Sequence, residues 1–288
     1  MADKPLLSAQ VLFRDKRLKI LLSYYRGATR KIINELNFAT DFGIYNRSKI
    51  LQNIDSALKD LDKKTHDWFN KEVEVYYKTH SNEAVGDLKA DSFPVITSFS
   101  KIDQEAVKTL ANDIMGYYRE AYSGVKRSAM RILSEAARER VKALLAEGRI
   151  SGDTRKQISD RIAGRLKSGL VALVDKGGRQ WSFEAYSEML TRTMLVRTAN
   201  EGMSNRLQQS GYDLVQVSDH FGACPLCKEW ETKILSLSGN HPEYPIVDKA
   251  RDEGLFHPNC RHRLLPYHEK LAEVSTIWNP KKQRYIKI

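Results

Sequence analysis

The sequence predicts a mainly α protein in which a long helical N-terminal body, residues 1–181, is followed by a small α+β module, residues 182–288. Two observations predict this fold class. Through most of the first two thirds of the chain, apolar residues recur at intervals of three and four, as they do along one face of an α-helix. From about residue 212 onward they alternate with polar residues, which is the pattern of a half-buried strand.

The most regular helical pattern covers residues 48–80, and Ser48 is its expected N-cap because a hydroxyl can accept a hydrogen bond from a first-turn amide. The apolar stripe of this segment consists of Ile50, Leu51, Ile54, Leu58, Leu61, Trp68, Phe69, Val73, Tyr76 and Tyr77. Such a stripe must be buried, and the apolar segment 21–38 is a candidate partner helix. The turn-forming residues of 81–100, Pro94 among them, predict a connection.

Two helices are expected after this connection. The first has Asp103 as its N-cap and stops at Gly148, with Gly116 and Gly124 as candidate positions for a kink or a break. The second covers residues 151–178, and the two glycines at its end are expected to terminate it.

The last long helix is expected between an N-cap at Ser182 and a stop at Gly211. Its expected core face consists of Tyr186, Met189, Leu190, Met194 and Leu195. Three short segments with strand character follow, at residues 213–219, 233–238 and 263–267. They predict the small β-containing module.

The chain is basic, with a formal net charge of +11 and a pI of about 9.4. Residues 112–181 contain 15 Lys and Arg against 8 Asp and Glu, so much of the positive excess lies there. Such an excess favours contact with DNA phosphates, although a solvated helix face is the alternative interpretation. The candidate DNA-contacting residues are Arg127, Arg131, Arg138, Arg140, Lys142, Arg155 and Lys156. The basic C-terminal stretch 277–288 is predicted to be a disordered tail, which could order on binding acidic protein or DNA.

The sequence gives no indication of a membrane or secreted protein. No run of eighteen apolar residues occurs, so no transmembrane helix and no membrane partner are expected. The N-terminal residues lack the order of a secretory signal. The three cysteines are too few for a disulfide framework, and in a reducing compartment clustered Cys and His more often bind metal.

All three cysteines lie in two short motifs, "CPLC" and "HPNC", separated by 29 residues. Cys224 and Cys227 form the first pair, and His257 and Cys260 form the second. Three thiolates and one imidazole form a tetrahedral set that suits structural zinc. The sequence therefore predicts a zinc ion that staples the small module, which is too small to bury much core by itself.

Other interpretations of the cysteines and histidines remain open. The cysteines could be reduced core residues, or "CPLC" could be a redox pair, although a strand soon after it does not fit a thioredoxin-like context. A zinc nuclease, with His220 or His262 activating water, is the main enzymatic alternative. Four protein ligands argue against it, because a catalytic zinc keeps an open position. A host-encoded nucleic-acid-binding zinc protein would need base-reading or stacking residues near the motifs, and around "CPLC" only Phe221 and Trp230 occur.

The stretch "RTANEGMSNRLQQSGYDLVQVSDHFGACPLCKEWETKILSLSG", with the later "GLFHPNCRHRLLPY", resembles the phage minor capsid protein 2 family, which is related to the phage head-morphogenesis minor head proteins. The resemblance covers about residues 185–268. It implies a non-enzymatic, low-copy structural protein of a tailed-phage head, associated with the portal, other head proteins and packaged double-stranded DNA. The expected location is the virion, after assembly in the reducing host cytoplasm.

The resemblance also implies a second ligand set. In the commonest form of the family, Arg and His stand where Cys224 and Cys227 stand in this chain. The positions shared with that form give a set of His220, Cys227, Cys260 and His262. The paired motifs favour the first set, because they bring the ligands together locally.

Overall fold

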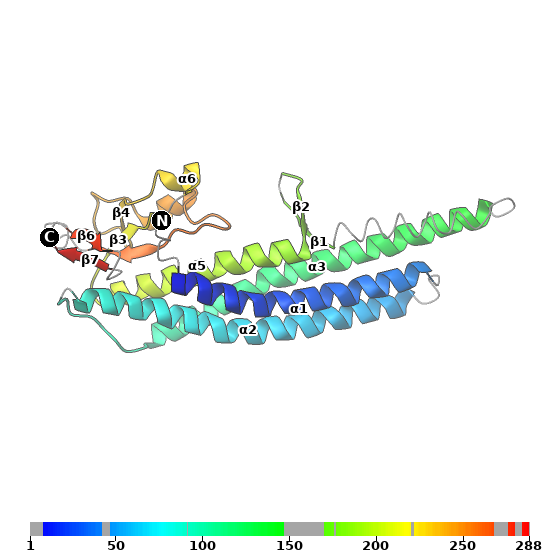
Figure 1. The fold of residues 1–288 in the computed structure, drawn as a ribbon, viewed down its shortest axis with the longest axis horizontal. Coiled ribbons are helices and arrows are strands. Elements are labelled where there is room, and N and C mark those ends of the chain that lie inside the picture. The colour runs from blue at the N-terminus through cyan, green and yellow to red at the C-terminus, as the bar shows by residue number, and fades with distance from the viewer. Residues whose placement is uncertain are drawn as a thin grey trace. The chain divides into compact units, whose positions relative to one another are not determined.

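Long helices make up most of the described residues before 147, and the strands are short and all lie after that point (Figure 1). The computed structural model describes residues 8–41, 47–90, 92–146, 170–175, 177–219, 222–267, 276–279 and 284–287. Its helices are α1 (Ser8–Asp41), α2 (Arg47–Ala90), α3 (Lys101–Ala146), α5 (Phe183–Gln209), α6 (Pro225–Lys228) and α7 (Val247–Asp252). Its strands are β1 (Val171–Val174), β2 (Gln180–Ser182), β3 (Leu214–Val217), β4 (Ile234–Ser236), β5 (Leu264–Pro266), β6 (Thr276–Asn279) and β7 (Arg284–Lys287). The predicted fold class, a mainly α protein with a small α+β C-terminal region, is confirmed.

The chain divides into two compact units. The first unit consists of Met1–Arg14, Asn70–Ala111 and Met189–Ile288, and the second consists of Asp15–Phe69 and Asn112–Glu188. Each of the four long helices therefore contributes residues to both units. The first unit contains the strands β3 to β7 together with parts of the four long helices.

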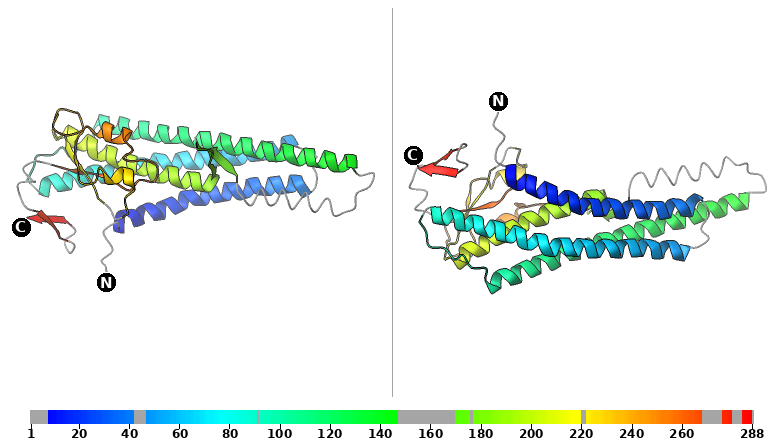
Figure 2. Two further views of the ribbon diagram at one scale, coloured as in Figure 1. Left: turned by 90° about the horizontal axis from the view of Figure 1, so that it is seen from above. Right: turned by 60° about the horizontal axis from the view of Figure 1, so that its bottom comes forward.

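In the second unit, α1, α2 and α3 lie side by side (Figure 2) and bury aromatic residues between them. The hydroxyls of Tyr25, Thr65 and Tyr122 hydrogen-bond to one another at 2.9–3.0 Å, so each of these three buried hydroxyls has a partner. Burial raises the pKa of Tyr25 well above its usual value. The apolar stripe of α2 is buried as predicted, apart from the half-buried Leu51, and the segment 21–38 belongs to its partner helix α1.

A β-hairpin replaces the end of the helix predicted for residues 151–178. Val171–Val174 and Gln180–Ser182 pair as the antiparallel strands β1 and β2, so the helical prediction was wrong there. The β-branched Val171 and Val174 at the two ends of "VALV" suit a strand, and the two glycines lie in the turn between the strands. Residues 151–169 of the predicted helix, and the predicted stop at Gly148, lie outside the described residues.

Gly124 marks a close approach to β1, and α3 runs through it and through Gly116 without the predicted break. A Cβ added at Gly124 would lie 1.8 Å from the backbone oxygen of Ala172, whereas a Cβ at Gly116 would meet nothing within 4 Å. Gly124 is therefore needed because the backbone of β1 passes directly over α3.

Gly124→Ala is expected to destabilise the protein by about 1–3 kcal/mol, because either β1 or α3 must shift to relieve the overlap. Gly116→Ala, on the same helix, is the matched control and should stabilise the protein by up to about 1 kcal/mol through helix propensity. Urea denaturation followed by circular dichroism would measure both changes. Equal effects of the two substitutions would contradict the close approach.

The two ends of α2 and the C-terminal stretch also differ from the predictions. α2 begins at Arg47, so Ser48 lies within the first turn instead of capping it. The helix also continues to Ala90, because Ala84 and Leu88 are buried, so the connection is shorter than the predicted 81–100. The C-terminal stretch, predicted to be disordered, contains the antiparallel pair β6 and β7.

The N-cap of α3 is Ser100 rather than Asp103. The Ser100 hydroxyl accepts a hydrogen bond from the Asp103 amide at 3.2 Å, and the Asp103 carboxylate accepts one from the Ser100 amide at 2.7 Å. This reciprocal pair is a capping box, in which the acidic residue occupies the third helical position. The Asp103 carboxylate also accepts hydrogen bonds from Tyr77 and Gln209.

Asp103 and Arg206 form a fully buried pair of opposite charges in the first unit. The Asp103 side chain is 0% exposed and the Arg206 side chain 1%, and their nearest charged atoms are 3.7 Å apart. Arg206 also donates hydrogen bonds to the backbone oxygens of Ile96 and Ser98. This arrangement joins α3, α5 and the connection after α2.

The remainder of the first unit is built on a three-stranded antiparallel sheet of order β4-β3-β5, which confirms the three predicted strands. β3 pairs with β4 through Val215 and Leu235, and with β5 through Val215 and Pro266. A parallel bridge joins Ser236 of β4 to Ile246. The helix before the sheet begins after Ser182, whose hydroxyl accepts from the Ala185 amide, as predicted.

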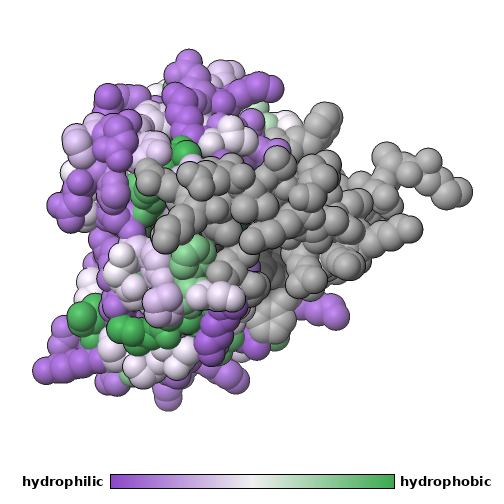
Figure 3. Space-filling view, turned by 90° about the vertical axis from the view of Figure 1, so that its left-hand side faces the viewer, coloured by the Kyte–Doolittle hydropathy of each residue, from purple (hydrophilic) through white to green (hydrophobic). Residues whose placement is uncertain are grey.

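Gly211, the predicted stop of α5, has a φ of +85°, a conformation that favours glycine and turns the chain toward β3. Of the predicted core face of α5, Tyr186, Leu190, Met194 and Leu195 are buried and Met189 is half-buried. None of the described helices is long and apolar enough to cross a lipid bilayer. The face in Figure 3 is mainly hydrophilic where its residues are described, with smaller hydrophobic groups between the polar ones.

Candidate metal centre

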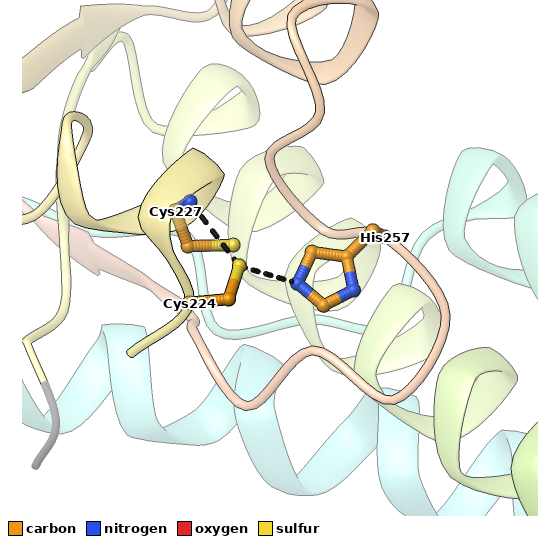
Figure 4. Close-up of side chains that lie close together, drawn as sticks. All are labelled: Cys224, Cys227 and His257. Atoms are coloured by element: carbon orange, nitrogen blue, oxygen red, sulfur yellow. Dashed lines mark hydrogen bonds between the residues drawn. The ribbon is translucent and has the colours of Figure 1, made fainter. Parts of the chain in front are cut away.

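The first cysteine pair is held by α6, a single helical turn between β3 and β4. Cys224 is the N-cap of this turn, and its sulfur accepts a hydrogen bond from the Cys227 amide at 3.5 Å. Pro225 occupies the first turn, where its fixed φ favours the helix and its missing N–H costs nothing. The "CPLC" sequence therefore sets both sulfurs on one side of a short turn (Figure 4).

The second pair lies in the loop after α7. The Cys260 amide donates to the backbone oxygen of His257 at 2.9 Å, which closes a turn around Pro258. Asn259 has a φ of +64° in this turn, and its amide donates to the Thr193 hydroxyl of α5. The "HPNC" loop is therefore fixed both by its own turn and by the long helix.

The structure brings the two pairs together, although they are far apart in the sequence. The Cys224 sulfur lies 3.1 Å from Nε2 of His257 (Figure 4), and the Cys227 sulfur lies 3.7 Å from the Cys260 sulfur. Two thiolates bound to one tetrahedral zinc, with Zn–S bonds of about 2.3 Å, are roughly 3.8 Å apart. The spacing of the buried sulfurs thus fits a shared zinc ion.

His262 extends the cluster beyond the two motifs. Its Nδ1 lies 3.4 Å from the Cys260 sulfur, and its Nε2 lies 3.0 Å from a carboxylate oxygen of Glu231. Sequence analysis did not single out Glu231, because "KEWET" has no spacing that distinguishes it from an ordinary surface turn. Only the folded chain brings this carboxylate to the histidine.

Together these side chains form two groups of potential metal donors that share Cys227. The first donor group is Cys224, Cys227 and His257, and the second donor group is Cys227, Cys260 and His262. Within each group the donor atoms lie within 4.8 Å of one another. The first donor group contains three of the four residues in the first predicted ligand set. The second donor group contains three of the four residues in the second predicted set. The remaining candidate, His220, lies outside the described residues.

The two thiols of "CPLC" differ in their acidity. The amide of Cys227 donates to the Cys224 sulfur and lowers the pKa of the Cys224 thiol, and His257 adds to this effect. Burial raises the pKa of the Cys227 thiol far above its usual value, and the neighbouring Cys260 raises it further. A bound cation would favour the thiolate form of both cysteines, including the buried Cys227, because it stabilises the negative charge directly.

The candidate DNA-contacting residues lie elsewhere, in the second unit. Arg127, Arg131 and Arg138 are exposed on α3, at spacings of four and seven residues that place them along one face. Arg131 also forms an ion pair with Glu135 at 3.5 Å. The side chains of Arg140 and Lys142, and all of Arg155 and Lys156, lie outside the described part of the chain.

Comparison with known proteins places this chain among the structural proteins of bacteriophages. The chain is 24% identical over 229 residues to a protein named "Structural protein" from Lactococcus phage LL-H, in an alignment that covers 76% of this chain and 59% of the relative. The sequence pattern of the family described as Phage minor capsid protein 2 matches residues 39–284. The chain therefore belongs to the Phage minor capsid protein 2 family, as the resemblance implied. No solved structure was found to match it.

Proposed function

We propose that this protein is a low-copy structural component of the head of a tailed phage, and that it associates with the portal, with other head proteins and with packaged DNA. The observation that carries the proposal is the family match over residues 39–284. The long helices of the first two thirds of the chain offer surfaces for protein and DNA contact. The chain performs no reaction in this role.

A structural zinc ion is part of the proposal. Three cysteine thiols and one imidazole would hold it, and the sequence set of Cys224, Cys227, His257 and Cys260 assigns the imidazole to His257. His262 and His220 are the alternative histidines. The ion would link the β3–β4 connection to the loop after α7 and so fix the shape of the small sheet.

Quantitative mass spectrometry of purified virions tests the location. We expect this chain in the particle at a copy number close to that of the portal subunits and far below that of the major capsid protein. Chemical cross-linking within intact heads should join it to the portal. A particle inventory that lacks the chain, or that contains it at major-capsid abundance, would overturn the proposal.

The exposed arginines of α3 should contribute to DNA binding through phosphate contacts. The triple substitution Arg127→Glu, Arg131→Glu and Arg138→Glu is expected to weaken binding to duplex DNA of any sequence and to reduce its dependence on salt. A filter-binding titration at several salt concentrations would measure both effects.

The control is a second triple variant with the same change of charge at exposed lysines outside 112–181, namely Lys89→Glu, Lys101→Glu and Lys108→Glu. It should lose less affinity than the arginine variant. Equal losses of affinity would mean that net charge alone determines binding, rather than the particular face that carries Arg127, Arg131 and Arg138.

A metal-dependent nuclease is the second candidate function. A cavity of about 440 Å³ borders His257 and Cys260, and Arg197 and Arg251 also line it. Cations beside a metal could bind a phosphate. Incubation of the zinc-loaded protein with duplex and single-stranded DNA should give no cleavage under the structural proposal, and metal-dependent cleavage would favour the nuclease.

A further inference from the structure

The Glu231–His262 pair is the most buried acid–histidine contact at the metal centre. The His262 side chain is 1% exposed and the Glu231 side chain 16%, and their nearest atoms are 3.0 Å apart. Glu231 lies in the turn between α6 and β4, next to Thr232, whose φ is +64°. The Thr232 amide donates to the backbone oxygen of Val217, which ties this turn to β3.

The carboxylate determines which nitrogen of His262 is available to a metal. A carboxylate accepts hydrogen bonds, so Glu231 favours the tautomer in which the proton is on Nε2. The lone pair then lies on Nδ1, the nitrogen that faces the Cys260 sulfur. A histidine that donates one ring N–H to a carboxylate and directs its other nitrogen at a metal is a recurrent arrangement in metalloproteins.

His257 has a weaker claim to the same role. Its Nδ1 lies 2.8 Å from the backbone oxygen of the adjacent Pro258, which favours the proton on Nδ1. Its Nε2 then carries the lone pair and faces the Cys224 sulfur. However, His257 is only half-buried, whereas His262 is buried together with Cys227 and Cys260. A carboxylate partner also increases the basicity of an imidazole ligand.

We infer that Glu231 is a positioning residue of the metal centre, which fixes His262 so that its Nδ1 coordinates the ion together with Cys224, Cys227 and Cys260. The inference rests on the proposed metal site. It assigns the imidazole of that site to His262, and it leaves the three cysteines unchanged. His257 then lies beside Cys224 without coordinating the ion.

Zinc affinity of the full-length chain, measured by competition with a chromogenic chelator, tests the role of Glu231. Glu231→Ala is expected to weaken zinc binding about ten- to a hundredfold, the usual effect of removing a residue that orients a ligand. Glu231→Gln should lose less, because its amide oxygen still accepts a hydrogen bond from Nε2. Glu229→Ala, two residues away and exposed, is the matched control and should bind zinc as the wild type does.

The absorption spectrum of the cobalt-substituted protein separates a ligand effect from a general loss of structure. His262→Ala should change the cobalt bands, Glu231→Ala should change them in the same direction, and His257→Ala should leave them close to those of the wild type. Wild-type affinity and spectrum in Glu231→Ala, or loss of metal in His257→Ala but not in His262→Ala, would overturn the inference and leave the proposed site intact. A wild-type chain that binds no metal would instead remove the site itself, and the virion location would still stand as a separate question.

Discussion

Replacing Cys227 with serine is expected to abolish stoichiometric zinc binding and to destabilise the first unit. Cys227 is the sulfur shared by both donor groups, and it is buried in the same core as Trp230 and Leu235. A ligand that binds only the folded state stabilises it by about 4 kcal/mol when its free concentration is a thousand times its Kd. Elemental analysis would measure the zinc content, and thermal unfolding would measure the loss of stability.

Chelator treatment supplies the control for this substitution. The wild type should carry about one zinc per chain, since one tetrahedral set is available, and removal of zinc should lower its unfolding temperature. The Cys227→Ser variant should be insensitive to the chelator, because no ion remains to be removed. A wild type that carries no zinc and unfolds at the same temperature with and without the chelator would show that the cysteines are only core residues.

Replacing Asp103 with alanine should have the next largest effect, a loss of about 3–5 kcal/mol, because it leaves the buried Arg206 charge uncompensated. It also removes the acceptor for Tyr77, Gln209 and the Ser100 cap. Urea denaturation would measure the change in the free energy of unfolding.

Glu105→Ala, on the same helix, is the matched control for Asp103. The Glu105 side chain is 69% exposed and contacts Lys101 at 4.0 Å, so its loss should cost at most about 1 kcal/mol. Similar losses for both variants would contradict a special role of the buried pair.

The same carboxylate predicts a dependence of stability on pH. Burial alone would raise the pKa of Asp103, but hydrogen bonds from Ser100, Tyr77 and Gln209 outweigh it and hold the pKa below its usual 3.8. A lowered pKa in the folded state stabilises the protein above the unfolded value, so this contribution should be lost as the pH falls below about 4. In Asp103→Asn, the decrease in the free energy of unfolding that protonation of this carboxyl causes below about pH 4 should be absent.

The sequence predicted those features whose causes are local. The stripe from Ile50 to Tyr77 indicated α2, the Ser182 hydroxyl indicated the start of α5, and period-two segments indicated β3, β4 and β5. The spacing within "CPLC" and "HPNC" was enough to propose that the two pairs meet.

Features that depend on distant partners were not predictable. β1 is a strand because it pairs with β2 and passes over Gly124, and neither contact is visible in the local pattern. Asp103 resembled an N-cap by its position, but Ser100 caps the helix and the carboxylate also faces Arg206 from α5. Glu231 reaches His262 across 31 positions of the chain, and no motif around Glu231 marks it as a partner of the histidine.

The two outer strands of the small sheet have a consequence for solubility. An open strand edge can pair with another molecule, and proteins that reach high local concentrations must prevent this. β4 and β5 have only three residues each, Ile246 covers part of β4 through its bridge to Ser236, and Pro266 presents no N–H donor on β5. The sheet should therefore resist edge-to-edge polymerisation between copies of the chain.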